Sequence, residues 1–235
     1  AMDLVLLNMY GNKLLTGYEM GLIDYYPMNE GVGDYAEDLA QGAHLRLDHV
    51  GWTEPRSMSL QLDKKRQQAD GMKGLQLKED FFSRDADQDY TLMFWFKTDE
   101  NGRGTLLSNG SGQATDVEPA DKFFIGFESD SLKYRANGQE FFLGNEYSDD
   151  RWHHFALTMN KAGQVANVYL DFTPKASFST EQIGGMGGNH FYLGNMVWNE
   201  QGPDNDKRYQ QNAMTGQIDG LTLFEQVLPP VLIQR

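Results

Sequence analysis

The sequence predicts an all-β chain folded as a two-sheet antiparallel sandwich of the jelly-roll type. Three observations lead to this prediction. Hydrophobic residues alternate with period two in many short runs, Gly, Asn and Asp separate those runs, and 25 of the 235 residues are glycine. No window of a dozen residues has a convincing helical pattern, and the best helix candidate is the short stretch 34–41. Many strands with few helices are typical of sandwiches and jelly rolls.

The clearest strand candidate lies at 90–98. Phe94 and Phe96 share one face there and Trp95 lies on the other, because successive side chains of a strand point to opposite sides. Further runs with the same alternation are also expected as strands: 22–28, 57–63, 73–79, 123–129, 153–160, 164–172, 191–196 and 216–224.

Two short segments between strand candidates predict hairpin turns. One is 160–164, and the other has Asn137-Gly138 at the tip of 129–142. The longest polar loops are 108–121 and 199–212, and loops of that length are usually functional or mobile. No Pro/Ser-rich linker divides the chain, so a single sandwich is expected.

Composition excludes several kinds of function. The chain has no cysteine, so it holds no cysteine nucleophile, thiolate zinc site or iron–sulfur cluster. Its formal net charge of −14 disfavours nucleic acid and anionic membrane surfaces as partners, and it suits cations. The apolar run at 4–7 is far shorter than the roughly 20 residues of a membrane-spanning helix, so no membrane insertion is expected.

Known catalytic signatures match poorly. The G-x-G-x-x-A pattern at 31–36 lacks the helix that a dinucleotide site needs, and the acidic run 85–89 lacks the later residues of an EF-hand. Sandwich glycosidases need two carboxylates held close together, and the nearest stretch, 128–133, lacks the expected spacing. The sequence therefore predicts a protein that is not an enzyme.

Six segments in order resemble the concanavalin A-like, laminin-G-like jelly-roll domains of bacterial multidomain surface proteins. The most specific are DDRWHH (149–154) and GQIDG (216–220). The six segments are 21–47, 90–100, 104–110, 149–172, 191–195 and 214–233. The chain departs from the family pattern at Gly220, where an acidic residue is usual, and at Pro229-Pro230, which interrupts the usual final short helix. The resemblance implies a jelly-roll sandwich.

The resemblance also implies a module of a longer protein, secreted or exposed at the cell surface, with neighbouring modules as partners. Residues 8–21 resemble the connector that ends one such domain and leads into the next. We therefore assign residues 1–20 to a connector and residues 21–235 to the laminin-G-like domain.

Some members of the resembling family hold a structural calcium ion. The oxygen donors that match the family motifs are Asn29, Glu30, Asp38 and Asp219, and calcium needs six to eight oxygen ligands. Each donor has an alternative structural role: Asp38 could bond backbone amides in its own turn, and Asp219 could bond to neighbouring backbone.

Sugar recognition needs an aromatic plate and polar groups for the hydroxyls. Rim loops of the family bind ligands, and the loop 197–212 and the segment 51–55 supply both kinds of group. The predicted ligand-binding residues are Trp52, Trp198, Asn199, Asp204, Asn205, Asp206 and Tyr209. Trp198 could instead close the end of the sandwich, and Trp95 and Trp152 are expected in the core.

These observations favour a non-catalytic binding module that recognises a carbohydrate or a protein at the cell surface. A spacer or adhesion repeat with no ligand of its own is the first alternative. A glycoside-active domain is the second, and the missing carboxylate pair argues against it.

Overall fold

The structure is a computed structural model, and it describes most of the chain from Leu15 to Ile233. The described residues are 15–28, 30, 33–42, 44–47, 51–52, 60–62, 75–77, 88–98, 103–110, 123–183, 190–194, 196–199, 208–211 and 213–233.

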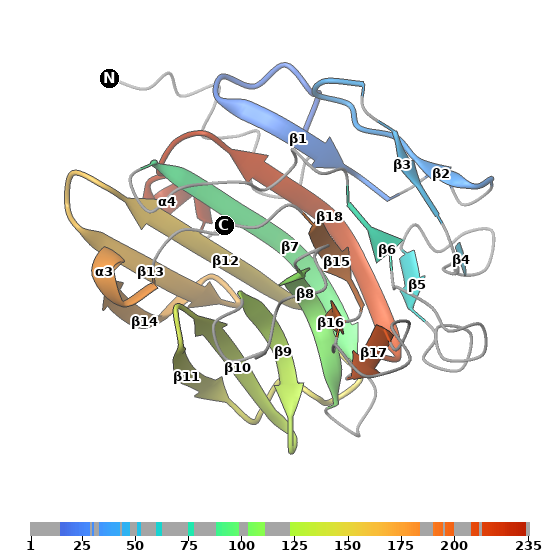
Figure 1. Ribbon diagram of the computed structural model, residues 1–235. Coiled ribbons are helices and arrows are strands. Elements are labelled where there is room, and N and C mark those ends of the chain that lie inside the picture. Colours follow the sequence, from blue (N-terminus) through green and yellow to red (C-terminus); the bar gives the residue numbers. More distant parts are fainter. Residues whose placement is uncertain are drawn as a thin grey trace.

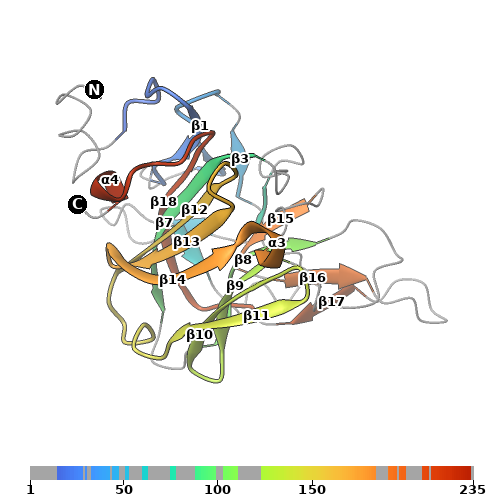
Figure 2. The ribbon, with the colours of Figure 1, turned by 90° about the vertical axis from the view of Figure 1, so that its left-hand side faces the viewer.

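Two antiparallel sheets are stacked as the layers of a sandwich (Figures 1 and 2). In the described part of the chain, the larger sheet has eight strands in the order β14-β13-β12-β7-β18-β5-β4, and β1 also pairs with β18. Its strands are β1 (Leu22–Tyr26), β4 (Gly51–Trp52), β5 (Leu60–Leu62), β7 (Tyr90–Thr98), β12 (His153–Asn160), β13 (Val165–Leu170), β14 (Thr173–Ser179) and β18 (Gly216–Phe224).

The smaller sheet has six described strands in the order β11-β10-β9-β8-β15-β6. They are β6 (Leu75–Gln76), β8 (Gly104–Gly110), β9 (Phe124–Glu128), β10 (Ser131–Ala136), β11 (Gln139–Gly144) and β15 (His190–Leu193). The predicted two-sheet antiparallel sandwich is therefore confirmed.

Short elements complete the described chain. They are the pairs β2 (Tyr35–Ala36) with β3 (Leu45–Arg46) and β16 (Met196–Asn199) with β17 (Arg208–Gln211), and the helices α3 (Thr180–Ile183) and α4 (Pro230–Ile233). The expectation that Pro229-Pro230 interrupts the last helix is wrong, because α4 starts at Pro230, and proline is tolerated in the first turn of a helix. Neither of these four-residue helices is long enough to cross a membrane.

The core lies between the two sheets and follows the predicted alternation. Phe94 and Phe96 of β7 are fully buried there, together with Phe155 of β12. Phe94 stacks on Phe155, with ring centroids 5.1 Å apart, and Phe96 meets Phe127 of the opposite sheet at 6.0 Å. Burying rings of this size supplies the largest part of the hydrophobic driving force of the sandwich.

A second apolar cluster covers the outer face of the larger sheet. Phe224 of β18 and Tyr169 of β13 pack there against Leu232 and Ile233 of α4, and Leu15 joins the same cluster. Glu19 is also buried, and it accepts hydrogen bonds from the backbone of Thr16 and Gly17. Residues 15–20, which the sequence assigned to a connector, thus pack on the sandwich, while residues 1–14 lie outside the described residues.

Both predicted hairpin turns are present. The 160–164 turn joins β12 to β13, and Gly163 N–H donates to Asn160 Oδ1. Asn137 and Gly138 both have positive φ (49° and 71°), as the two-residue turn between β10 and β11 requires. The weak helix candidate 34–41 is wrong, since this stretch holds β2 and a turn around Asp38.

Trp95 and Trp152 are not core residues, contrary to the sequence prediction. Trp95 is only half-buried on the outer face of β7, and the Trp152 side chain is 39% exposed. Trp95 meets the rings of His154 and Phe172 edge-on, at 5.1 and 5.5 Å between centroids. The strand motif placed Trp95 correctly on the face opposite Phe94 and Phe96, but it did not show which face the second sheet covers.

A glycine substitution tests the packing of β8. A Cβ at Gly104, which has φ +128°, would lie 2.5 Å from Cα of Met214, whereas one at Gly42, with φ +74°, would meet nothing within 4 Å. We expect Gly104→Ala to lower the free energy of unfolding by about 3 kcal/mol or more, and Gly42→Ala by about 1 kcal/mol from backbone strain alone. Urea titrations of both variants measure this, and equal losses would contradict the close approach of β8 to Met214.

Candidate functional site

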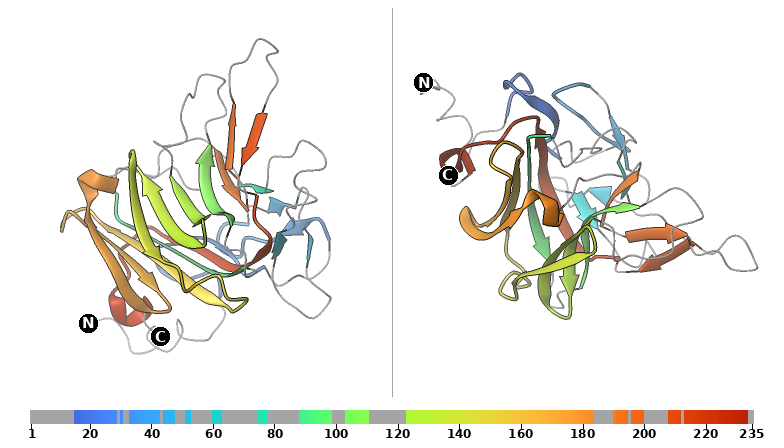
Figure 3. Two further views of the ribbon diagram at one scale, coloured as in Figure 1. Left: turned by 90° about the horizontal axis from the view of Figure 1, so that it is seen from below. Right: turned by 60° about the vertical axis from the view of Figure 1, so that its left-hand side comes forward.

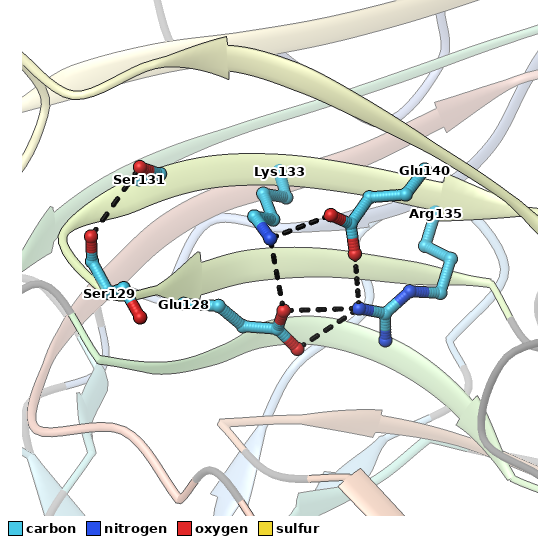
Figure 4. Close-up of polar contacts among 6 residues, drawn as sticks. All are labelled: Glu128, Ser129, Ser131, Lys133, Arg135 and Glu140. Atoms are coloured by element: carbon cyan, nitrogen blue, oxygen red, sulfur yellow. Dashed lines mark hydrogen bonds and ion pairs between the residues drawn. The ribbon is translucent and has the colours of Figure 1, made fainter.

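Four charged side chains form a network on the outer face of the smaller sheet. Glu128 ends β9, Lys133 and Arg135 lie on β10, and Glu140 lies on β11 (Figure 4). Each cation lies between the two carboxylates, and each carboxylate contacts both cations. The charges alternate in sign around the network and sum to zero.

The contacts are close. Lys133 Nζ lies 2.6 Å from Glu140 Oε1 and 3.3 Å from Glu128 Oε2. Arg135 Nη2 lies 3.1 Å from both oxygens of Glu128 and 2.5 Å from Glu140 Oε2. Bonds of this kind between ionised partners are stronger than neutral hydrogen bonds, and the shared geometry holds all four side chains in place.

The strand register brings the four residues together. The turn at Asn137-Gly138 pairs Arg135 with Glu140 and sets Lys133 opposite Phe142. Leu132 and Tyr134 point into the core, so Lys133 and Arg135 must point outward between them. Glu128 reaches them from β9, across the tight turn at Ser129-Asp130, where Ser131 Oγ also donates to Ser129 O at 3.4 Å.

The ion pairs favour the charged forms of Lys133, Arg135 and Glu140. Hydrogen bonds from Lys133 and Arg135 lower the pKa of Glu140, and hydrogen bonds to Glu140 and Glu128 raise the pKa of Lys133 against the effect of burial. Burial lowers the pKa of Arg135, but its bonds and charge interactions with Glu140 and Glu128 outweigh burial and raise the pKa. Around neutral pH the face therefore presents fixed carboxylate acceptors and fixed cationic donors side by side.

Aromatic rings border the network on the same face. Phe142, opposite Lys133 on β11, is 65% exposed. Phe124 is covered, because Arg135 Cζ lies 5.1 Å above its ring. Gly126 leaves room for that ring, since a Cβ there would lie 2.8 Å from Phe124 Cζ. We name Glu128, Lys133, Arg135, Glu140 and Phe142 the charged face.

The carboxylate pair of the charged face does not have the properties of a glycosidase pair. Glu128 and Glu140 contact the same Arg135 nitrogen, so their nearest oxygens are less than about 6 Å apart, similar to the spacing in retaining enzymes. A general acid, however, needs a raised pKa and a proton to give. The pKa of Glu140 is lowered, and both carboxylates are acceptors for two cations. Such a pair binds donors but does not protonate a leaving group.

The predicted calcium ligands are only partly described. Asp38 takes its structural alternative, because its carboxylate accepts hydrogen bonds from the backbone of Tyr25, Ala40 and Gln41. Glu30 Oε1 accepts from Glu37 N, while its buried Oε2 has no hydrogen-bond partner among the described residues. Asn29 lies outside them.

The donors that the structure describes are not gathered around one point. Within the described ranges, no group of three or more His, Asp or Glu side chains is placed to hold a metal ion. The expected calcium ion stays an untested prediction.

Asp219 lies at an irregularity of β18. It is opposite Trp95 of β7, and the register shifts between Asp219 and Thr222, where Gly220 has φ +58°. Partial burial raises the pKa of its carboxyl group to about 7. A hydrogen bond from the Gly220 backbone lowers this pKa, but burial is the larger effect. The pKa of Tyr25 on β1 is raised to about 12. Burial is the main cause, and the charge of Asp219 is the second.

The predicted rim residues fall mostly on the β16–β17 hairpin or outside the described residues. Trp198 is opposite Tyr209 and Asn199 is opposite Arg208 in that hairpin, which projects beside β8 (Figure 3). Asp204, Asn205 and Asp206 lie outside the described residues. Trp52 is far along the chain from this hairpin. Its side chain is half-buried, and its Nε1 donates a hydrogen bond to the backbone oxygen of Gly33 at 2.9 Å. Strand pairing thus sets Trp198 opposite Tyr209. Ligand binding by these rim residues stays a prediction.

His153 and His154 are adjacent on β12, so their side chains point to opposite faces of the larger sheet. Both ring nitrogens of His153 face carboxylates, Nδ1 that of Asp171 at 2.8 Å and Nε2 that of Asp149 at 2.9 Å. A neutral imidazole has one N–H, so only the imidazolium donates both bonds. His154 stacks on Phe172, and burial lowers its pKa to about 4. Both imidazoles thus serve packing and tethering in this structure.

Sequence reasoning missed the charged face, although the signal for it was present. A two-residue turn at Asn137-Gly138 by itself fixes the pairs Arg135 with Glu140 and Lys133 with Phe142. The carboxylate motif of sandwich glycosidases lies along one strand, whereas the network joins three strands. Its members lie 5 to 7 positions apart along the chain where they bond.

The two stacked antiparallel sheets define a jelly-roll sandwich domain. The profile of the family described as the concanavalin A-like lectin/glucanases superfamily matches residues 70–234. The chain therefore belongs to this family, as the sequence motifs predicted. No curated protein matches it.

Solved structures share the fold at low sequence identity. The binding domain of Paraclostridial Mosquitocidal Protein 1 is 14% identical (TM-score 0.59; 91% of this chain, 51% of that one). The botulinum neurotoxin serotype D binding domain is 12% identical (0.57; 91% and 50%). Trypanosoma rangeli sialidase in complex with sialic acid is 14% identical (0.59; 98% and 36%). The chain spans about a third to a half of the structures it matches, and these likenesses show the fold alone.

Asp219 makes folding stability depend on pH. The pKa of its carboxyl is about 7 in the fold and 3.8 ordinarily, so the unfolded chain releases a proton that the folded chain keeps. Stability from this group is therefore lost as pH rises from about 4 to 7. We expect Asp219→Asn to match the native chain at pH 4 and to exceed it by about 1–3 kcal/mol at pH 8.

Urea unfolding of both chains from pH 4 to 8, in EDTA, measures that difference. EDTA is needed because a bound cation would favour the ionised carboxylate. A constant difference across this range, or a less stable variant at pH 8, would show that the carboxyl is ionised at no cost in the fold.

Proposed function

We propose that the chain is a non-catalytic carbohydrate-binding module and that the charged face is its binding surface. The observation that carries this proposal is the network of Glu128, Lys133, Arg135 and Glu140 beside the exposed ring of Phe142. Sugar hydroxyls donate and accept hydrogen bonds at once, so they fit a surface that alternates fixed acceptors and fixed donors.

Phe142 supplies the apolar part of such a site. A phenyl ring exposed on a strand offers a flat surface for the C–H face of a pyranose, and aromatic side chains bury large areas with little loss of rotamer entropy. Its cross-strand neighbour Lys133 is held by two carboxylates, so the polar groups next to the ring are already in place. Preorganised groups reduce the entropic cost of binding.

The position of the face supports a binding role. It lies on three hydrogen-bonded strands whose other sides are anchored in the core by Phe127, Tyr134 and Leu143. Sites on strands hold their geometry better than sites on loops. Some of the solved structures with this fold are described as binding domains, which is consistent with the proposal.

Other functions remain alternatives to be tested. A protein ligand would use the same exposed ring and charges, and a spacer would use neither. A glycoside-active domain is disfavoured, because ion-paired carboxylates do not act as proton donors. We further propose, from the family alone, that the protein acts outside the cell beside other modules.

Replacing the exposed ring tests the proposal. We expect Phe142→Ser to reduce affinity for the bound glycan by about tenfold or more, because stacking area is lost, with stability changed by less than about 0.5 kcal/mol. A glycan array identifies the ligand, and calorimetry measures the affinities. Tyr18→Ser is the matched control, because Tyr18 is an aromatic side chain that is 92% exposed elsewhere on the surface.

Three results would contradict the proposal. A blank array for folded protein would favour the spacer. Equal losses in Phe142→Ser and Tyr18→Ser would show a non-specific effect of surface aromatics. Loss of binding in Trp198→Ala, with Phe142→Ser unchanged, would place the ligand at the predicted rim instead of the charged face.

A further inference from the structure

We infer that the charged face selects neutral glycans and rejects glycans that carry a carboxylate or sulfate. This inference rests on the proposed function, since it names the ligand class of the same surface. Three observations support it: the ion pairs of Lys133 and Arg135, the Phe124 ring against Arg135, and the negative charge of the whole chain.

Both cations of the face are already ion-paired, each with two carboxylates of the protein. Lys133 Nζ is shared by Glu140 and Glu128, and Arg135 Nη2 is shared by the same two carboxylates. The side chains of Lys133 and Arg135 are only 23% and 15% exposed, against 40% for Glu140. A ligand that approaches from solvent therefore meets carboxylate oxygen more readily than ammonium or guanidinium.

The guanidinium of Arg135 is also closed from one side. Its Cζ lies 5.1 Å from the centroid of the buried Phe124 ring, so this ring covers one face of the guanidinium. Bidentate recognition of a ligand carboxylate needs two free parallel N–H groups on one edge. In Arg135 the Nη2 group is occupied by Glu128 and Glu140, so that edge is not free.

Charge balance points the same way. The four network charges sum to zero, and the chain carries a formal net charge of −14. An anionic ligand would be repelled at long range and would find no uncompensated cation at short range. A ligand anion would compete with Glu128 and Glu140 for these two cations, and a partly desolvated carboxylate that loses its cation is costly.

Neutral sugars avoid these costs. A hydroxyl can donate to an oxygen of Glu140 or Glu128 while the existing ion pairs remain, because each carboxylate has about four lone-pair positions. The ring of Phe142 accepts the apolar face of the same sugar. Neutral glycans therefore gain bonds from this surface without disturbing its network.

Matched glycan pairs test the inference. The probes are the desialylated and sialylated forms of one N-glycan, and the neutral and sulfated forms of one galactan oligosaccharide, measured by array and calorimetry at low salt. We expect every bound neutral form to bind at least about tenfold more tightly than its acidic counterpart. We also expect added salt to lower this ratio of affinities, because salt screens the repulsion between the acidic glycan and the negatively charged protein.

The variant Glu140→Gln should weaken the preference for neutral over acidic glycans. Removing one carboxylate charge leaves the network with an excess positive charge, so the neutral-to-acidic ratio should fall by about tenfold. Glu181→Gln is the control, because Glu181 is exposed in α3, and its change removes one negative charge, as Glu140→Gln does, without touching the network. That variant should leave the ratio within about twofold of the native one.

The outcomes separate the inference from the proposed function. Equal or tighter binding of the acidic forms, with loss in Phe142→Ser, would overturn the inference and keep the function. A ratio unaffected by Glu140→Gln would show that this network does not set selectivity, and it would also overturn the inference. A folded protein that binds neither form would overturn both.

Discussion

The period-two alternation of side chains along a strand is the constraint on which the rest of this structure depends. Once Phe94, Phe96 and Phe155 are buried between the sheets, the residues between them must face outward. On the larger sheet the outward residues include an apolar group around Phe224 and Tyr169, which α4 and Leu15 cover. On the smaller sheet the outward residues of β9, β10 and β11 include the four charged residues of the network and the exposed Phe142.

The charged face follows from the same constraint combined with two tight turns. Burial of Leu132 and Tyr134 fixes the outward direction of Lys133 and Arg135, and the turns on either side of β10 bring Glu128 and Glu140 beside them. Surface ion pairs contribute little stability one at a time, so the value of this network lies more in fixed geometry than in energy. A rigid array of donors and acceptors suits recognition, and the exposed Phe142 adds the contact area that charges alone lack.

Local patterns predicted more of the fold than of the site. The strands at 90–98, 153–160 and 216–224 have the predicted bounds, because alternation and turn residues are properties of short segments. The site predictions depended on groups far apart in sequence meeting in space. Asp38 shows the difficulty: its carboxylate already accepts hydrogen bonds from two backbone amides of its own turn and from that of Tyr25 on β1. The charged face was predictable in part, since the Asn137-Gly138 turn sets the β10–β11 register. Its role as a binding surface depends on the solvent exposure of Phe142, which the sequence does not show.

The sequence by itself determined the sandwich, the alternation of its strands, both hairpin turns and membership of a lectin-like family, because each follows from residues close together along the chain. Only the tertiary structure decided which outward faces are covered. The packing of α4 and Leu15 covers part of one sheet, while Phe142 and the network on the other sheet stay open to solvent. It also decided that Asp219 is half-buried and that Trp95 is not in the core, since burial depends on elements distant in sequence.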